Sequence, residues 1–316
     1  MTRHFLSSDD LSPDEQAALV RRALDLKPAR SDHPRTLQGR SVGMIFEKPS
    51  TRTRVSFEVA AVEMGAHPVL LRMDEVQLGR GESVADTARV LSRFLDAIVI
   101  RTFAQERLTE LASAASVPVI NALSDFEHPC QALADVMTVA ERFSVPSSVR
   151  LCYLGDGNNN VCHSLLLAGA KAGWAAVTIA SPEGYMPNPL VVDRAQEIAA
   201  ANKSKTKIDV CSDPDEAVRG AHVLYTDVWV SMGEEGQRSE RLQALRDYAL
   251  TRRRLEDASP GALVMHCLPA HRGEEIEASV IDGPSSVVWD QAENRLHTAK
   301  AVLEWLMDGT AARGPR

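Results

Sequence analysis

The fold is decided by residues 41–62, which read SVGMIFEKPSTRTRVSFEVAAV. Residues 41–46 are short and apolar, as expected of a buried strand, whereas Val55, Val59 and Val62 recur at helical spacing. A polar turn joins the two stretches, and Gly65 is placed to end the helix. A strand that leads through a turn into a helix is the unit of a parallel sheet with crossover helices.

The same unit recurs along the chain. Residues 12–15 read as a capping box that opens a helix to about residue 27. Helices of ten or more residues, among them 82–96 and one from Pro129, separate the predicted strands, which are 41–46, 69–73, 97–100, 117–120, 149–154, 176–180, 208–211, 222–225 and 263–266. The last predicted helix covers 293–307. The sequence therefore predicts an α/β protein of two domains, each a parallel β-sheet flanked by helices, with the boundary in the polar segment 145–148.

Composition limits the classes of partner. Among 316 residues, 35 Lys+Arg against 43 Asp+Glu give a formal charge of −8, so the chain is not built to coat nucleic acid or an anionic membrane. An anionic ligand must therefore bind in a local basic pocket. Five cysteines, none spaced as Cys-x-x-Cys, argue against a disulfide framework and favour a reducing compartment. With no apolar signal core or spanning run in the sequence, we expect a cytoplasmic protein.

The turn 50–54 is the first candidate site. Backbone N–H groups at a helix start favour an anion, and Ser50, Thr51 and Thr53 add hydroxyls to the guanidiniums of Arg52 and Arg54. These donors suit a phosphate-sized dianion, although the glycines of a Walker loop are absent. The alternative is a capped helix with solvated arginines.

Three further polar residues follow in the first half. Arg101 stands at the carboxyl end of a predicted strand, where open α/β sheets place ligands. His128 and Gln131 flank a predicted helix start and offer an imidazole and an amide. A capping or core histidine explains His128 equally well.

The second half carries two candidate turns. Residues 155–160, GDGNNN, follow a strand like a dinucleotide loop but lack its third glycine, so the asparagine amides face the crevice. A tight turn with a helix cap is the alternative. Asp227 follows another strand and can hold an ammonium group, and Ser231-Met232-Gly233 reads as a mobile loop.

Residues 266–269, HCLP, end the last predicted strand. Neighbouring side chains on a strand face opposite ways and the spacing fits no zinc pattern, so His266, Cys267 and His271 are not expected to bind metal. Cys267 lacks an identifiable base for nucleophilic work, so a polar role is favoured. Leu268–Pro269 is a candidate cis peptide.

Together, and in this order, the motifs resemble the aspartate/ornithine transcarbamoylase family, over essentially the whole chain. The Ser-Met-Gly and His-Cys-Leu-Pro segments resemble its ornithine-specific branch. The resemblance implies transfer of the carbamoyl group of carbamoyl phosphate to the δ-amino group of L-ornithine, giving citrulline and phosphate in arginine metabolism. It implies no metal and no organic cofactor.

The resemblance also implies the domain roles. Residues 1–144, joined by a C-terminal helix in 293–316, would bind carbamoyl phosphate, and 145–292 would bind ornithine, with domain closure on the substrates. The unit would be a homotrimer, or a multiple of trimers, with active sites at subunit interfaces and no nucleic acid or membrane partner.

The site residues that the resemblance implies fall into groups. The catalytic residues would be Arg101, His128, Asp227 and Cys267. Carbamoyl phosphate would be bound by Ser50, Thr51, Arg52, Thr53, Arg101, His128, Gln131, Cys267, Leu268, Arg295 and, from a neighbouring subunit, Gln77. Ornithine would be bound by Asn160, Asp227, Ser231 and Met232.

Three rival interpretations stay open on the sequence. A related transcarbamoylase would act on putrescine, an acylated ornithine or aspartate, and an aspartate enzyme would need a cationic pocket in place of Asp227. A nucleotide-dependent oxidoreductase built on residues 155–157 leaves the other motifs unexplained. A catalytically dead paralogue is the third interpretation, although every implied position holds a competent residue.

Overall fold

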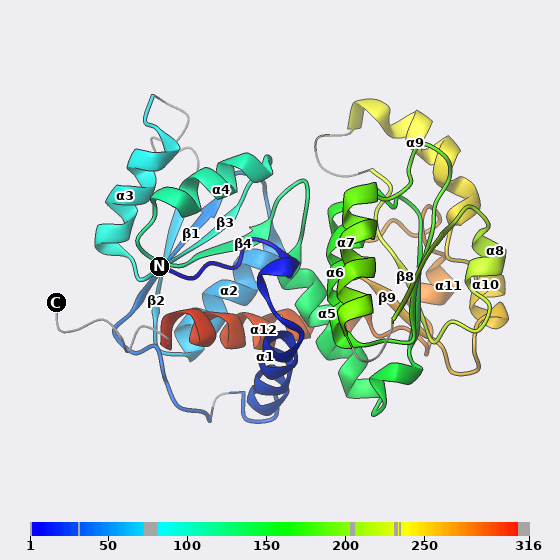
Figure 1. Ribbon diagram of the computed structural model, residues 1–316, viewed down its shortest axis with the longest axis horizontal. Coiled ribbons are helices and arrows are strands. Elements are labelled where there is room, and N and C mark those ends of the chain that lie inside the picture. Colours follow the sequence, from blue (N-terminus) through cyan, green and yellow to red (C-terminus); the bar gives the residue numbers. More distant parts are fainter. Residues whose placement is uncertain are drawn as a thin grey trace. The chain divides into compact units, whose positions relative to one another are not determined.

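The computed structural model describes residues 2–30, 32–72, 81–202, 206–230, 233 and 235–308. The chain forms two compact units (Figure 1). Unit 1 comprises Met1–Met137 and Glu293–Arg316, and unit 2 comprises Thr138–Ala292. Among the described residues, every helix is too short or too polar to cross a bilayer.

Unit 1 alternates strands with helices. Its elements are a short 3-10 turn Ser8–Asp10, α1 (Pro13–Leu26), β1 (Ser41–Phe46), α2 (Thr51–Glu63), β2 (His67–Arg72), α3 (Val84–Phe94), β3 (Ala97–Arg101), α4 (Gln105–Ala114), β4 (Val119–Leu123) and the start of α5 (Pro129–Arg142). The four strands are parallel in the order β2-β1-β3-β4. The capping box before α1 is confirmed, because Ser12 and Glu15 exchange side-chain and backbone hydrogen bonds.

Unit 2 repeats this plan. Its elements are β5 (Arg150–Leu154), α6 (Asn160–Ala172), β6 (Ala176–Ala180), α7 (Pro189–Ala201), β7 (Lys207–Cys211), α8 (Pro214–Ala217), β8 (Val223–Thr226), α9 (Arg238–Leu245), α10 (Arg252–Asp257), β9 (Leu263–His266), α11 (Ala278–Ile281) and the start of α12 (Val288–Asp308), with 3-10 turns at Pro146–Ser148, Glu235–Gln237 and Arg246–Tyr248. The sheet is parallel in the order β7-β6-β5-β8-β9.

Each sheet packs against its flanking helices in an apolar core. In unit 1, Ile45, Ile98 and Val119 of the strands pack with Leu108 and Leu111 of α4. In unit 2, the corresponding core includes Leu154 and Leu224 from the sheet and Ile281 from α11. Figure 1 shows α3 beside α4 and α6 beside α7, as their packing contacts require. The prediction of two parallel sheets flanked by helices is confirmed.

Both strand orders contain a reversal in the direction of winding. In unit 1 it lies between β1 and β3, where Phe46 pairs with Arg101. In unit 2 it lies between β5 and β8, where Leu154 pairs with Thr226. Crevices at the carboxyl ends of such strand pairs are where open α/β sheets bind ligands. The polar turns predicted as sites therefore leave their strands where ligand binding is expected.

The predicted start of the last helix was wrong by more than one helical turn. The last helix begins at Val288, five residues before the predicted start. Gln291 lies in its first turn and is fully buried, accepting from the backbone N–H of His266 at 2.9 Å and donating to the hydroxyl of Tyr225 at 3.1 Å. These partners come from distant strands, so the local sequence gave no sign that a polar residue belonged inside the helix.

Candidate active site

The turn between β1 and α2 leads into a helix whose N-cap side chain does not bond the first N–H groups. Ser50 occupies the N-cap position of α2 with extended backbone, yet its side chain makes no capping hydrogen bond. The N–H groups of the first turn are therefore not satisfied by Ser50 and carry the positive end of the helix dipole. Thr51 is exposed and Arg52 half-buried at this turn, so the geometry supports the predicted anion-binding role.

Arg295 of α12 organises the polar residues behind that turn. Its guanidinium donates to the Thr53 hydroxyl at 2.7 Å and to the Gln131 carbonyl oxygen at 2.7 Å, and lies 3.4 Å from Nε2 of His128. All four residues are buried. Since the Thr53 oxygen accepts from Arg295, its own hydroxyl hydrogen is left to donate. Four predicted residues from distant parts of the chain thus form one cluster.

His128 is held neutral in this cluster. Burial lowers its pKa well below the ordinary value of 6.5, and the neighbouring positive charges of Arg295, Arg101 and Arg52 lower it further. Of these three guanidiniums, that of Arg295 lies against the ring, 3.4 Å from Nε2. The cluster therefore combines guanidinium charge with one neutral imidazole ring.

In unit 2, Asp227 is the centre of the candidate site. It directly follows β8, is buried, and accepts hydrogen bonds from the Cys267 thiol at 2.8 Å and the Asn159 amide at 3.2 Å. Its Oδ1 also accepts from the backbone N–H of Val228 at 2.8 Å. These neutral donors leave a net negative group, which suits an amine ligand.

The sequence reasoning missed Asn159. The structure makes Asn159 the N-cap of α6, with Oδ1 accepting from the Val161 N–H at 2.7 Å while Nδ2 reaches Asp227. Asn160, the predicted ornithine ligand, is the first residue of α6 and half-buried. The N-cap preference for asparagine could have identified Asn159, because one residue of the run had to cap the helix.

The segment after β9 is held by a buried pair of residues. Nδ1 of His266 accepts from the Leu268 N–H at 2.8 Å, so its proton lies on Nε2, 3.2 Å from the carboxylate of fully buried Glu275. Leu268 has φ +60°, an unfavourable angle for a branched residue, and the His266 bond helps to hold it. The cis peptide predicted at Leu268–Pro269 is confirmed. Sequence reasoning did not identify Glu275.

Two groups of described residues bring ligand-type atoms within 4.8 Å of one another. They are Asp227, His266 and Cys267, and His271, Glu274 and Glu275. The expectation that His266 and Cys267 face apart was wrong, because β9 ends at His266 and the alternation ends with it. In the first group the facing atoms are used in protein hydrogen bonds: the thiol donates to Asp227 and His266 accepts from Leu268. A metal-free site stays a prediction.

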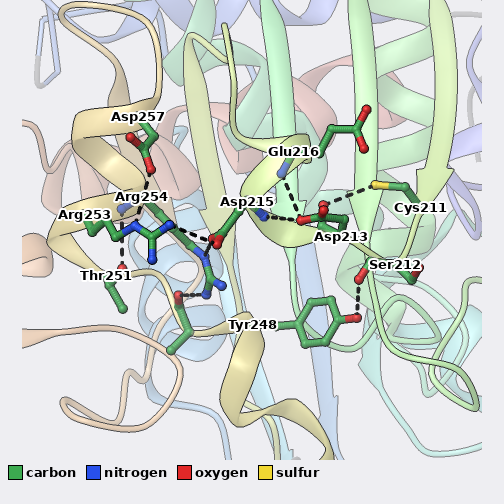
Figure 2. A network of polar contacts seen from close by, with 11 residues as sticks. Cys211, Ser212, Asp213, Asp215, Glu216, Tyr248, Thr251, Arg253, Arg254 and Asp257 are labelled. Atoms are coloured by element: carbon green, nitrogen blue, oxygen red, sulfur yellow. Dashed lines mark hydrogen bonds and ion pairs between the residues drawn. The ribbon is translucent and has the colours of Figure 1, made fainter.

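A polar cleft of about 620 Å³ lies elsewhere on unit 2, lined by Pro214, Asp215, Arg246, Asp247, Thr251, Arg253, Arg254 and Glu277. Figure 2 shows that its central charges pair with each other: Arg254 and Arg253 both reach Asp215, at 2.8 and 3.3 Å. Tyr248 donates to the Ser212 carbonyl at 2.6 Å beside them. Each guanidinium in this network already has a carboxylate, so the cleft has no charge excess to recruit a ligand.

Gln77, Ser231 and Met232, which were predicted to bind substrates, lie outside the described residues.

Comparison with known proteins agrees with this geometry. Residues 3–141 match the aspartate/ornithine carbamoyltransferase carbamoyl-P binding domain, and residues 147–306 match the aspartate/ornithine carbamoyltransferase Asp/Orn binding domain. An ornithine carbamoyltransferase of Acidothermus cellulolyticus is 56% identical over 315 residues, covering 99% of both chains. One from Methanoculleus marisnigri is 52% identical, again over 99% of each.

Solved structures give the same result. The ornithine carbamoyltransferase of Pyrococcus furiosus is 48% identical, with a TM-score of 0.93 and coverage of 97% of each chain. The anabolic ornithine carbamoyltransferase of Campylobacter jejuni is 36% identical, with a TM-score of 0.92 and coverage of 98% of this chain and 100% of that one.

A guanidinium cluster in one parallel sheet domain and a carboxylate cluster in the other are features expected of an enzyme that joins an anionic donor to an amine. The chain belongs to the aspartate/ornithine carbamoyltransferase family. Within it, the activity is that of the ornithine branch: the enzyme transfers the carbamoyl group from carbamoyl phosphate to L-ornithine, giving L-citrulline and phosphate.

Proposed function

We propose that unit 1 is the carbamoyl phosphate domain and unit 2 the ornithine domain. The observation that carries this assignment is the opposite charge of the two clusters. In unit 1, Arg295 lies 3.4 Å from His128, whose pKa is lowered by burial and by the positive charges of Arg295, Arg101 and Arg52. In unit 2, buried Asp227 accepts from the neutral donors Asn159 and Cys267. The match of residues 3–141 to a carbamoyl-P binding domain supports the same division.

In unit 1, the phosphate is assigned to Ser50, Thr51, Arg52 and Thr53 at the start of α2. Arg52 is the bidentate partner of the phosphate, and the backbone N–H groups of the first turn add donors along the helix axis. The carbamoyl end is assigned to Arg101, His128 and Gln131. Arg295 holds Thr53, Gln131 and His128 in place, and its own charge adds to the attraction.

In unit 2, ornithine is assigned to Asp227, Asn160, Ser231 and Met232. Asp227 attracts an ammonium group, and the Cys267 thiol is fixed beside it at 2.8 Å. Asn159 is added to this set as the residue that fixes the second carboxylate oxygen. Cys267 and Leu268 keep their predicted assignment to the transferred carbamoyl group.

The chemistry follows from these assignments. The δ-amino group, with an ordinary pKa of about 10.4, must be neutral to attack the carbonyl carbon. Asp227 and Cys267 orient it. Attack produces a tetrahedral oxyanion, which Arg101, His128 and the Thr53 hydroxyl stabilise. Phosphate leaves into the turn at Ser50–Arg52 and takes the proton of the amine, so a separate protein base is not required. Holding the two substrates together supplies much of the rate.

We further propose a homotrimer, or a multiple of trimers, in which Gln77 completes a neighbouring subunit's site. Sedimentation or light scattering of the pure protein would give a mass three times, or a multiple of three times, that of the 34.4 kDa chain. A monomer with full activity would remove Gln77 from the site. The free cysteines fit the proposed reducing, cytoplasmic location.

The deciding experiment uses the pure enzyme with carbamoyl phosphate and, separately, ornithine, putrescine, N-acetylornithine or aspartate. Carbamoylated product and released phosphate are measured for each amine. Citrulline from ornithine alone supports the ornithine assignment of the Asp227 cluster. Preference for another amine would overturn that assignment while leaving the carbamoyl phosphate cluster in place.

A further inference from the structure

Arg241 of α9 is a buried charge that the reaction does not use. It is only 8% exposed, whereas the three residues before it in α9 are all exposed. Its Nε donates to the backbone carbonyl of Trp229 at 2.5 Å, and its Nη2 pairs with the carboxylate of Asp156. The guanidinium also lies over the Tyr185 ring, 5.2 Å from its centroid. Burying a charge is unfavourable unless it is paired and hydrogen-bonded, so this arrangement is specific.

The two groups that Arg241 joins belong to the two turns of the ornithine site. Trp229 comes two residues after Asp227, on the segment that leaves β8. Asp156 lies in the turn that leaves β5, and its Oδ1 accepts from the Asn158 N–H at 3.0 Å. The end of that turn is Asn159, whose amide bonds Asp227. Arg241 therefore ties together the same two segments that meet again at the Asn159–Asp227 hydrogen bond.

The two segments joined by Arg241 are also closely packed against each other. Gly155 has φ +127°, and a Cβ there would lie 3.2 Å from the indole nitrogen of Trp229. A Cβ on Gly157 would lie 2.6 Å from the Ser181 hydroxyl oxygen. The turn is thus closely packed against the Trp229 segment, so that loss of the Arg241 contacts is expected to change their spacing.

We propose that Arg241 is a positioning residue for ornithine: it fixes the spacing between Asp227 and the start of α6, and thereby the affinity for the amine substrate. The inference rests on the proposed placement of ornithine at Asp227. The role suits arginine, because its planar guanidinium directs separate N–H groups at a carbonyl and a carboxylate, which a lysine ammonium does not reproduce.

The test is Arg241→Lys, which keeps the positive charge but loses the planar guanidinium with its separate N–H groups. We expect the KM for ornithine to rise about 10- to 100-fold, because one or two charge-assisted hydrogen bonds are lost. The change in kcat should be smaller. The Kd for carbamoyl phosphate, measured without ornithine, should stay within about twofold. The matched control is Arg246→Ala, whose side chain is 75% exposed and pairs with exposed Asp247. This change should leave all three values unchanged.

An unchanged ornithine KM in folded Arg241→Lys would overturn the inference, as would equal losses of ornithine and carbamoyl phosphate affinity. If Arg241→Lys does not fold, Asp156→Asn decides the matter, because it keeps the shape of the partner and must raise the ornithine KM. Asp227→Asn is run in parallel. If it leaves ornithine kinetics unchanged, the ornithine assignment itself fails; if it raises the KM and Arg241→Lys does not, only the role of Arg241 fails.

Discussion

The two clusters occupy the same place in their sheets and carry opposite charge. Each lies at the carboxyl edge where the winding reverses, between β1 and β3 in unit 1 and between β5 and β8 in unit 2. In unit 1 the residues around that position are guanidiniums, and in unit 2 the residue is a carboxylate. This is the arrangement expected where sheet topology sets the place of a ligand and side-chain charge selects the ligand.

The clusters also differ in how their charge is held. In unit 1, Arg295 donates to two neutral acceptors, Thr53 and Gln131, at 2.7 Å each. Asp227 is fixed by neutral donors, Asn159 and Cys267, so its charge remains available to a cation. Each of these contacts joins a charged group to a neutral one, whereas in Figure 2 the guanidinium of Arg254 contacts the carboxylate of Asp215.

The largest effect is expected from Asp227→Asn, which removes the charge of unit 2 and keeps the shape. We expect kcat/KM for ornithine to fall about 100- to 1000-fold, because losing one partner of a buried charged pair costs about 2–5 kcal/mol. Carbamoyl phosphate affinity, measured calorimetrically without ornithine, should not change. Glu197→Gln, on the exposed face of α7, is the control for loss of one negative charge. Equal loss of both affinities would show that the clusters are not separate sites.

Arg52→Ala tests the opposite charge in unit 1. Carbamoyl phosphate should bind about 10- to 100-fold more weakly, since a charge-assisted hydrogen bond contributes about 1.5–3 kcal/mol. Binding of an unreactive ornithine analogue should be unchanged if measured alone. Exposed Arg89→Ala in α3 controls for net charge. Near-normal affinity in Arg52→Ala would mean that the phosphate does not bind at Arg52.

The buried, neutral ring of His128 makes the stability of the folded protein depend on pH. Because the folded pKa of His128 lies below 6.5, the ring is neutral in both states above that pH. As the pH falls from 6.5 towards the folded pKa, the unfolded chain takes up a proton that the folded chain does not, so stability decreases by up to about 1.4 kcal/mol per pH unit. Urea unfolding is measured for wild type and His128→Gln from pH 7.5 to 5.5. The free energy of unfolding should fall more steeply with decreasing pH in wild type than in the variant. Parallel slopes would contradict the buried neutral ring; taking the difference also cancels His4 and His297, whose pKa values are lowered too.

The smallest effect is expected in the paired network of unit 2. Tyr248→Phe removes the hydrogen bond to the Ser212 carbonyl and should lower the free energy of unfolding by about 0.5–1.5 kcal/mol. Both substrate affinities should remain as in wild type. Differential scanning calorimetry and steady-state kinetics measure the two quantities. A changed ornithine KM would mean that this cleft is coupled to the Asp227 cluster.

Much of the fold was predictable because the signals are local. The apolar run at 41–46 and the valine spacing after it placed β1 and α2, and the capping box placed α1, since each depends on residues within a few positions. The first turn of α12 was not predictable in this way. Its buried Gln291 belongs in the helix only because His266 and Tyr225 supply partners from other strands.

The sequence by itself determined the alternation of strands and helices, the polar turns at strand ends and, through the order of the motifs, the transferase family. Only the tertiary structure decided which side chains meet. Arg295 joins Thr53, Gln131 and His128, Asn159 bonds Asp227, Glu275 lies beside His266, and Arg241 joins Asp156 to the Trp229 carbonyl. The physical reason is range. Helix and strand signals act between near neighbours in sequence, whereas a hydrogen bond or a shifted pKa depends on distance in space, which folding alone sets.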